Sequence, residues 1–263
     1  MDIDFKKTAS KLGFKALAAN WNEYAHEPCI KRLLEQEEVD KHRRSLERRL
    51  RESQINEMKP AAEFDWVWPK KIDRELVEDL FTLKFVEEPA NVIFMGPNGV
   101  GKTMLAKNLI HRALLAGYKT RFTPASQMLN DLSSQDGASA RLKSLRKYTS
   151  PDLLVIDELG YLSYDNRYAD LLYEVINGRY MKSSTILTTN KPFQEWGEIF
   201  TNAGCVVTLV DRLMHKAEVV LIEGASFRNR EATERAELRA QKKRGKGKKD
   251  GGGESNAKGS DPA

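Results

Sequence analysis

The sequence contains little cysteine and no long hydrophobic run. Its two cysteines, Cys29 and Cys205, form no C-x-x-C pair in a chain of 263 residues, so we expect neither a disulfide framework nor a cysteine metal site. No stretch approaches the roughly 18 apolar residues of a membrane-spanning helix. Charged residues interrupt the apolar stretches of the N-terminus, which is not typical of a secretion signal. These absences predict a soluble, cytoplasmic protein with no membrane partner.

Metal-ligand patterns and a global excess of charge are missing as well. The four histidines have no ligand spacing, and no helix-turn-helix or zinc-finger pattern occurs, which argues against sequence-specific base reading. The net charge is +5, but residues 235–263 contain nine Lys/Arg and four Asp/Glu, so the preceding residues are neutral. Binding to nucleic acid would therefore depend on local basic surfaces.

The first part of the chain has a helical pattern. Apolar residues recur at spacings of three to five in residues 1–60, which predicts a small all-helical N-terminal domain. The segment 61–71 has aromatic residues but no period, so we expect a tether that docks Phe64, Trp66 and Trp68 onto the next domain.

Residues 72–234 alternate helical patterns with short apolar runs, which predicts an α/β domain with a parallel sheet and crossover helices. Residues 235–263 are basic, polar and glycine-rich, and we expect this tail to be disordered. The predicted strands are 91–95, 119–123, 152–157, 184–189 and 218–222, and the predicted helices are 103–116, 137–148, 168–180 and 206–215.

A phosphate-binding loop is the strongest motif. The octet GPNGVGKT follows an apolar strand and precedes a helical pattern, the context that G-x-x-x-x-G-K-[ST] requires. Its glycines let the backbone amides surround a polyphosphate, Lys102 reaches the β and γ phosphates, and Thr103 offers its hydroxyl to Mg²⁺. The alternative is a glycine-rich turn with an accidental lysine. The residues predicted to bind ATP are Gly96, Pro97, Asn98, Gly99, Val100, Gly101, Lys102, Thr103 and Met104.

Two adjacent acids end the apolar run LLVIDE at 153–158. In this architecture Asp157 would hold Mg²⁺ directly or through water, and Glu158 would orient and deprotonate the attacking water. The alternative is a strand followed by a solvated acidic turn. A further apolar run, STILTTN, ends at Asn190, which by itself is more often a turn former.

The order GPNGVGKT, LLVIDE, TTN and VDRLMHKAEVVLIEGASFR resembles the AAA+ ATPases of the initiator and helicase-loader group. It is most similar to the IstB-like transposition ATPases, which are related to the DnaC loader. The resemblance implies a P-loop AAA+ three-layer α/β/α fold with a five-stranded parallel sheet. In that sheet the strand ending at Asn190 lies between the phosphate-loop strand and the acidic strand.

The resemblance also implies roles for three side chains. Asn190 would orient the attacking water beside Glu158, Arg212 would be an arginine finger for a neighbouring subunit, and Arg228 would sense the γ phosphate. Two surface arginines in ion pairs remain the alternative. The chain leaves no room after Arg228 for the helical lid of many AAA+ proteins, so we expect neighbouring subunits to cover the nucleotide.

Two basic segments are predicted to contact the phosphates of duplex DNA without reading its sequence. Solvated charged helix faces are the alternative for both. The predicted contacts are Arg141, Lys143, Arg146 and Lys147 in one segment and Arg43, Arg44, Arg48 and Arg51 in the other.

Together these features predict an ATPase that uses ATP and Mg²⁺ and forms homo-oligomers on duplex DNA. The resemblance implies that it hydrolyses ATP at subunit interfaces and recruits or activates a transposase. A DnaC-type loader of a replicative helicase and a non-catalytic, ATP-bound DNA scaffold are the alternatives. The number of subunits and the form of the assembly stay open.

Overall fold

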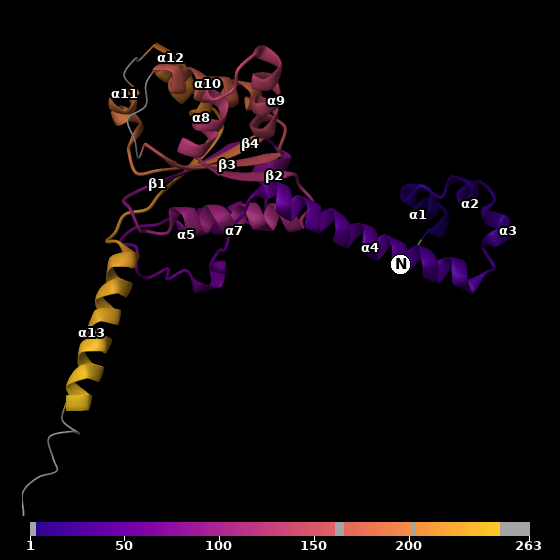
Figure 1. Cartoon of the computed structure of the whole chain (residues 1–263), viewed down its shortest axis with the longest axis horizontal. Coiled ribbons are helices and arrows are strands. Elements are labelled where there is room, and N and C mark those ends of the chain that lie inside the picture. The colour runs from indigo at the N-terminus through magenta and orange to yellow at the C-terminus, as the bar shows by residue number, and fades with distance from the viewer. Residues whose placement is uncertain (1–3, 161–165, 201–203, 248–263) are drawn as a thin grey trace, which may run out of the picture.

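A five-stranded parallel sheet forms the centre of the protein (Figure 1). The computed structural model describes residues 4–160, 166–200 and 204–247. The strand order is β2-β3-β4-β1-β5. The strands are β1 (Asn91–Met95), β2 (Thr120–Pro124), β3 (Leu153–Leu159), β4 (Ser184–Thr189) and β5 (Ala217–Leu221).

The predicted sheet is confirmed, including the position of β4 between β1 and β3. The predicted strands 91–95 and 184–189 match β1 and β4, and those for β2 and β5 are displaced by one residue. The acidic strand β3 continues past its predicted end to Leu159, with an irregular register between Ile156 and Leu159. The end of β3 is therefore distorted where the two acids lie.

Helices cover both faces of the sheet because successive strand residues point to opposite sides. Ile93 packs with one layer of helices and its neighbours Val92 and Phe94 pack with the other. This arrangement confirms the three-layer fold. One layer contains α5 (Arg74–Leu80), α6 (Lys84–Glu87) and α7 (Lys102–Leu115); the other contains α8 (Ala125–Ser133), α9 (Ala138–Thr149), α10 (Asn166–Arg179), α11 (Trp196–Ile199) and α12 (Gly204–Met214).

The N-terminal part is helical, as predicted, and has a small core of its own. Ala9, Ala18 and Leu34 are buried there. The long helix α4 leads from this core to the sheet domain, where its end meets α7 and β2 (Figure 1). The helices are α1 (Phe5–Leu12), α2 (Lys15–Ala19), α3 (Trp21–Tyr24) and α4 (Pro28–Ser53).

The tether docks its three aromatic residues on the sheet domain, as predicted. Phe64 is buried in the core on the α7 side, where Trp66 also packs, and Trp68 makes an edge contact with Phe227. A short 3-10 helix, Ala61–Glu63, precedes them. The tether is therefore an ordered part of the domain surface.

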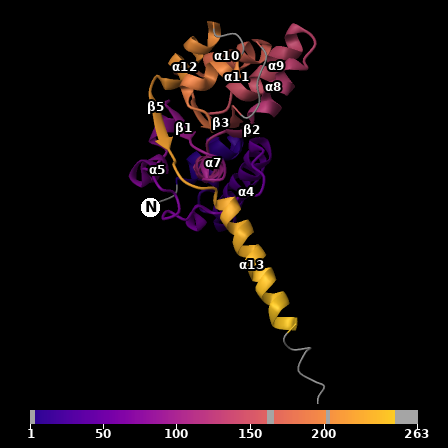
Figure 2. The ribbon, with the colours of Figure 1, turned by 90° about the vertical axis from the view of Figure 1, so that its left-hand side faces the viewer.

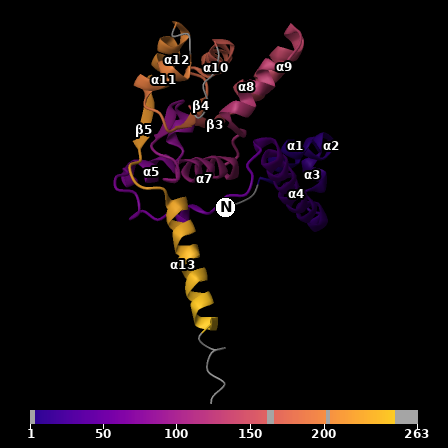
Figure 3. The ribbon, with the colours of Figure 1, turned by 60° about the vertical axis from the view of Figure 1, so that its left-hand side comes forward.

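The predicted disordered tail needs a correction. Helix α13 runs over Phe227–Gly247 and projects away from the domain (Figures 1, 2 and 3), so disorder is wrong for 235–247. The segment up to 247 contains many good helix formers and few glycines, and Arg230–Glu234 and Arg235–Glu231 pairs support its first turns. The remaining residues, 248–263, lie outside the described part of the chain.

Cys29 and Cys205 are free thiols. Within residues 4–160, 166–200 and 204–247, no helix has the length and apolar character needed to cross a bilayer. In the same ranges, no three His, Cys, Asp or Glu side chains gather as a metal cluster would require.

Candidate nucleotide-binding site

The phosphate loop between β1 and α7 turns sharply because of its glycines. Gly99 has φ 79° and Gly101 has φ 102°, values that other residues rarely adopt. Neither has room for a side chain, because a Cβ on Gly99 would lie 2.2 Å from the Ser226 hydroxyl and one on Gly101 would lie 2.4 Å from the Phe64 ring. The loop is thus held between the tether and the segment that leads into α13.

Helix α7 begins at Lys102, directly after the loop. Its free N–H groups and dipole favour an anion at this end. Lys102 Nζ donates hydrogen bonds to the carbonyl oxygens of Gly96 and Pro97, both at 2.6 Å. Burial lowers the Lys102 pKa to about 8; Asp157 opposes this shift and Arg228 adds to it. Phosphate oxygens at this position would stabilise the charged lysine.

Asp157 is held in place by two hydroxyl groups. Thr103 Oγ1 donates to Asp157 Oδ1 at 3.0 Å, and Thr188 Oγ1 donates to the same oxygen at 2.5 Å. The Asp157 carboxylate is almost fully buried. A carboxylate and a hydroxyl at the base of a phosphate loop are oxygen ligands of the kind that Mg²⁺ takes, so Thr103 and Asp157 fit the predicted metal site.

Glu158 lies at the distorted end of β3 in a left-handed conformation, with φ 60°. Such backbone strain in a residue other than glycine is concentrated at functional sites. Thr188 stabilises it, since the Glu158 N–H donates to Thr188 Oγ1 at 2.9 Å. The Glu158 side chain is exposed and lines the same cavity as the phosphate loop.

Asn190, directly after β4, lines this cavity too. Its side-chain oxygen is buried and has no hydrogen-bond partner within the described residues. A buried amide oxygen without a partner is costly, and a water molecule in the cavity would satisfy it. The structure therefore brings Asn190 and Glu158 together at one cavity, as the resemblance implies.

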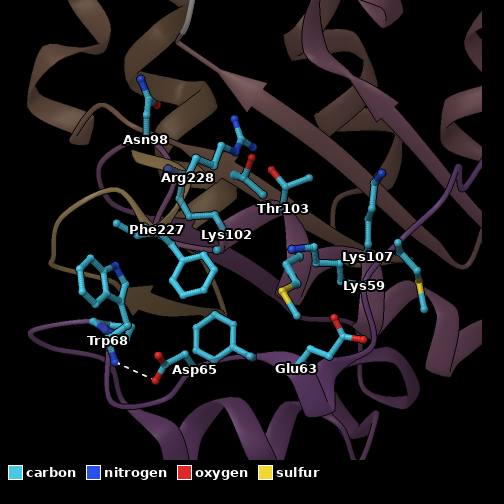
Figure 4. Close-up of a pocket in the computed structure, with 18 of the residues that line it drawn as sticks. Lys59, Glu63, Asp65, Trp68, Asn98, Lys102, Thr103, Lys107, Phe227 and Arg228 are labelled. Atoms are coloured by element: carbon cyan, nitrogen blue, oxygen red, sulfur yellow. Dashed lines mark hydrogen bonds between the residues drawn. The ribbon is translucent and has the colours of Figure 1, made fainter. Parts of the chain in front are cut away.

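The cavity has a volume of about 280 Å³ and extends from the phosphate loop to the tether. Phe227 and Arg228 of α13 border it (Figure 4), and so does Glu231 of the same helix. The tether and α13 of the same chain therefore supply one wall of the cavity, and the expectation that neighbouring subunits cover the nucleotide stays a prediction.

Three polar contacts join the tether and Lys59, just before it, to the α13 region. Trp68 Nε1 donates to the Ala225 carbonyl at 2.9 Å. Two ion pairs lie alongside, Asp65–Arg230 at 3.3 Å and Lys59–Glu231 at 3.2 Å. These contacts keep Arg228 of α13 close to Lys102, whose pKa it influences.

Arg212 lies at the opposite end of the strands, near the starts of β1 and β4. It is near the end of α12 and borders a small cleft with Asn91 and Thr185, which are at the starts of β1 and β4. The phosphate loop follows the carboxyl end of β1, so the length of the sheet separates Arg212 from the cavity of its own chain. Arg212 does not line that cavity.

The predicted DNA contacts differ in their surroundings. On α9, Arg141 pairs with Glu174 and Lys147 pairs with Asp131, whereas Lys143 and Arg146 are exposed and make no ion pair within the described residues. On α4, Arg43 and Arg44 pair with acids of the same helix, and the exposed Arg48 and Arg51 make no such pair in the described ranges.

Thr188 is the site residue that the sequence analysis missed. Its hydroxyl contacts both Asp157 and the backbone of Glu158. The polar end of STILTTN was a usable signal, because polar residues at the carboxyl end of a central parallel strand often face the site.

Comparison with known proteins identifies the relatives of this chain. The family model of the IstB-like ATP binding protein matches residues 6–235. An insertion sequence IS5376 ATP-binding protein of Geobacillus stearothermophilus is 36% identical over 230 residues, which cover 84% of this chain and 92% of the relative. An insertion sequence IS21 ATP-binding protein of Pseudomonas aeruginosa is 36% identical over 198 residues, 75% of each chain.

Among solved structures, DnaI is similar in fold. It has a TM-score of 0.51 and 16% identity, and the match covers 64% of this chain and 89% of DnaI. The phosphate loop, the acidic strand and the family match over residues 6–235 lead to one conclusion: this chain belongs to the family of IstB-like ATP binding proteins.

Proposed function

We propose that this protein is an ATPase that assembles on duplex DNA, hydrolyses ATP between its subunits and recruits or activates a transposase. The proposal rests on the separation of Arg212 from the other proposed catalytic residues. Lys102, Glu158 and Asn190 line one cavity at the carboxyl ends of the strands, whereas Arg212 lies near the amino ends. A second chain is needed to bring the two parts together.

The residues of the cavity support hydrolysis as well as binding. Thr103 and Asp157 would hold Mg²⁺, which neutralises the phosphates and stabilises charge in the transition state. Lys102 and Arg228 would neutralise the γ phosphate. Glu158 would accept a proton from the attacking water while the Asn190 amide oxygen orients it, since both face the cavity.

The position of Arg212 supports the proposed assembly of identical subunits. An arginine supplied in trans stabilises the charge of phosphoryl transfer and can accelerate hydrolysis about 10³- to 10⁵-fold. A chain whose own arginine cannot reach its nucleotide would then be slow when alone. Hydrolysis would therefore depend on the formation of the homo-oligomer.

Duplex DNA is the proposed surface for assembly. The free cations Lys143 and Arg146 on α9 and Arg48 and Arg51 on α4 suit phosphate contacts. The sequence has no helix-turn-helix or zinc-finger pattern, which is consistent with the expected binding to any sequence. The insertion-sequence origin of the relatives supports a transposase as the client.

The test compares single variants with a mixture of two variants. Arg212→Ala should bind ATP with less than a threefold change in Kd yet lose at least 100-fold in turnover. Glu158→Gln should also bind ATP and be inactive. Mixing the two should restore turnover, because the Glu158→Gln subunit still donates its arginine to an intact site. Equal turnover of Arg212→Ala and the unchanged protein would contradict the proposal.

The alternatives predict other results. A non-catalytic scaffold would show no increase in turnover with duplex DNA. A helicase loader would prefer single-stranded DNA and would bind a hexameric helicase in a pull-down, whereas the proposed regulator would bind a transposase.

A further inference from the structure

Helix α10 lies between the basic helix α9 and helix α12, which carries Arg212, and it contacts both (Figure 1). It contributes no residue to the nucleotide cavity. One side of α10 contacts α9 and another contacts Arg212 of α12. A movement of α9 would therefore reach α12 through α10.

One side of α10 holds the guanidinium of Arg212. Arg212 donates a hydrogen bond to Asn177 Oδ1, and its guanidinium carbon lies 4.8 Å from the centroid of the Tyr173 ring and 5.6 Å from that of Tyr180. Residues 173, 177 and 180 are spaced by four and three, so they form one stripe. A long side chain at the domain surface thus has a defined position.

The other side of α10 contacts α9. Glu174 pairs with Arg141 at 2.6 Å. The two helices approach closely further on, where a Cβ on Gly178 would lie only 2.8 Å from Thr149 Cγ2. Along the same turns of α10, Tyr173 and Asn177 contact Arg212, and the next residues, Glu174 and Gly178, contact α9.

Arg179 makes the junction rigid. Its guanidinium is almost fully buried and donates to the carbonyl oxygens of Tyr148 at 2.8 Å and Pro151 at 2.9 Å, and to Thr185 Oγ1 at 3.0 Å. These bonds tie the end of α10 to the end of α9 and to β4. Because these bonds are buried, they hold the end of α10 firmly against the end of α9.

We propose that α10 transmits DNA contact on α9 to the arginine finger, with Asn177 and Tyr173 as the positioning residues for Arg212 and the Glu174–Arg141 pair as the link to α9. DNA phosphates compete with Glu174 for the Arg141 guanidinium. When Arg141 binds a phosphate, the ion pair between α9 and α10 is lost and α10 can shift. Because Arg212 is bonded to Asn177 of α10, a shift of α10 changes the position of Arg212. The proposal rests on the proposed function of Arg212.

The first test uses Asn177→Ala. It should retain nucleotide and DNA affinity within a factor of two and lose about tenfold in DNA-stimulated kcat. Mixing it with Glu158→Gln subunits should restore turnover to the level reached by the Arg212→Ala mixture. A purely structural defect would not be repaired by a neighbour's arginine, so a mixture that stays inactive would overturn the proposal.

The second test uses Glu174→Gln. Turnover without DNA should stay within a factor of two, DNA affinity should be equal or higher because Arg141 is released, and stimulation by DNA should fall at least threefold. The matched control is Glu75→Gln on α5, an exposed glutamate distant from α9, which should change nothing. Full stimulation in Glu174→Gln would contradict the link.

The two proposals fail in different ways. If Arg212→Ala keeps its turnover, the assignment of the finger is wrong. If Arg212→Ala is inactive and both Asn177→Ala and Glu174→Gln behave like the unchanged protein, only the role of α10 is wrong.

Discussion

At the scale of residues, the environment of Lys102 differs between the nucleotide-free and the nucleotide-bound protein. In the structure its ammonium group contacts two carbonyl oxygens of the phosphate loop and is partly buried, and burial lowers its pKa to about 8. A bound triphosphate would bring negative charge to the same place and raise the pKa again. Burial of the charged Lys102 therefore costs free energy in the nucleotide-free protein, and a bound phosphate would offset this cost.

Nucleotide binding should therefore take up a proton near pH 8. At a pH equal to the pKa about half of the lysines are neutral, so binding should absorb about half a proton per site at pH 8 and almost none at pH 6.5. Titration calorimetry in two buffers with different ionisation enthalpies measures this uptake. Above pH 8 the affinity should fall by up to about tenfold per pH unit.

Lys102→Arg provides the control for this prediction. Its guanidinium stays charged throughout the pH range, so any binding that remains should be independent of pH between 7.5 and 9. Equal proton uptake in this variant and in the unchanged protein would assign the titration to another group.

At the scale of elements, α9 shows that a count of basic residues overstates a binding surface. Two of its four predicted DNA contacts, Arg141 and Lys147, form ion pairs with acidic side chains of the same chain. The partner of Lys147, Asp131, also accepts a hydrogen bond from the hydroxyl group of the buried Tyr148. The exposed pair Lys143 and Arg146 lies one turn apart on the same helix. This pair can contact phosphates without first breaking an ion pair, whereas Arg141 must exchange Glu174 for a phosphate.

Replacing Lys143 and Arg146 together by Gln should weaken DNA binding and lower the slope of log K against log salt by about two, since each phosphate contact contributes about one. Binding titrations at several salt concentrations measure the slope. A double change to Gln at Lys70 and Lys84, two exposed lysines remote from α9, removes the same charge and should leave the slope unchanged. An equal effect of both double variants would indicate only a loss of net charge.

At the scale of the whole molecule, the sheet separates the two halves of the proposed active site. The cavity lies at the carboxyl end of β1, and Arg212 lies near the starts of β1 and β4. Stacking one chain on the next, head to tail, would place the arginine of one against the cavity of another. Such a contact is heterologous and builds rings or helical filaments.

Turnover per subunit should therefore rise with protein concentration. We expect at least a tenfold increase between a dilute, monomeric sample and one in which sedimentation shows oligomers, and duplex DNA should move the rise to lower concentrations. Arg212→Ala should show no rise. Constant turnover per subunit across the monomer-to-oligomer range would exclude a site shared between chains.

The sequence by itself determined the local features of this protein. The phosphate loop, the acidic strand end and the five strands were predicted within one or two residues, because each depends on the spacing of residues that are close in the chain. The family resemblance correctly implied the position of β4 between β1 and β3. The helix at 235–247 was not predicted, because the basic and polar composition of this segment is typical of disorder although many of its residues have high helix propensity.

Only the tertiary structure decided which distant residues meet. It joined Thr188 to both acids, placed the tether and α13 along the cavity, paired Arg141 with Glu174 and set Arg212 against α10. These contacts connect residues that are about 30 to 170 positions apart in the chain. No local pattern encodes them, because they result from the packing of helices on a twisted sheet.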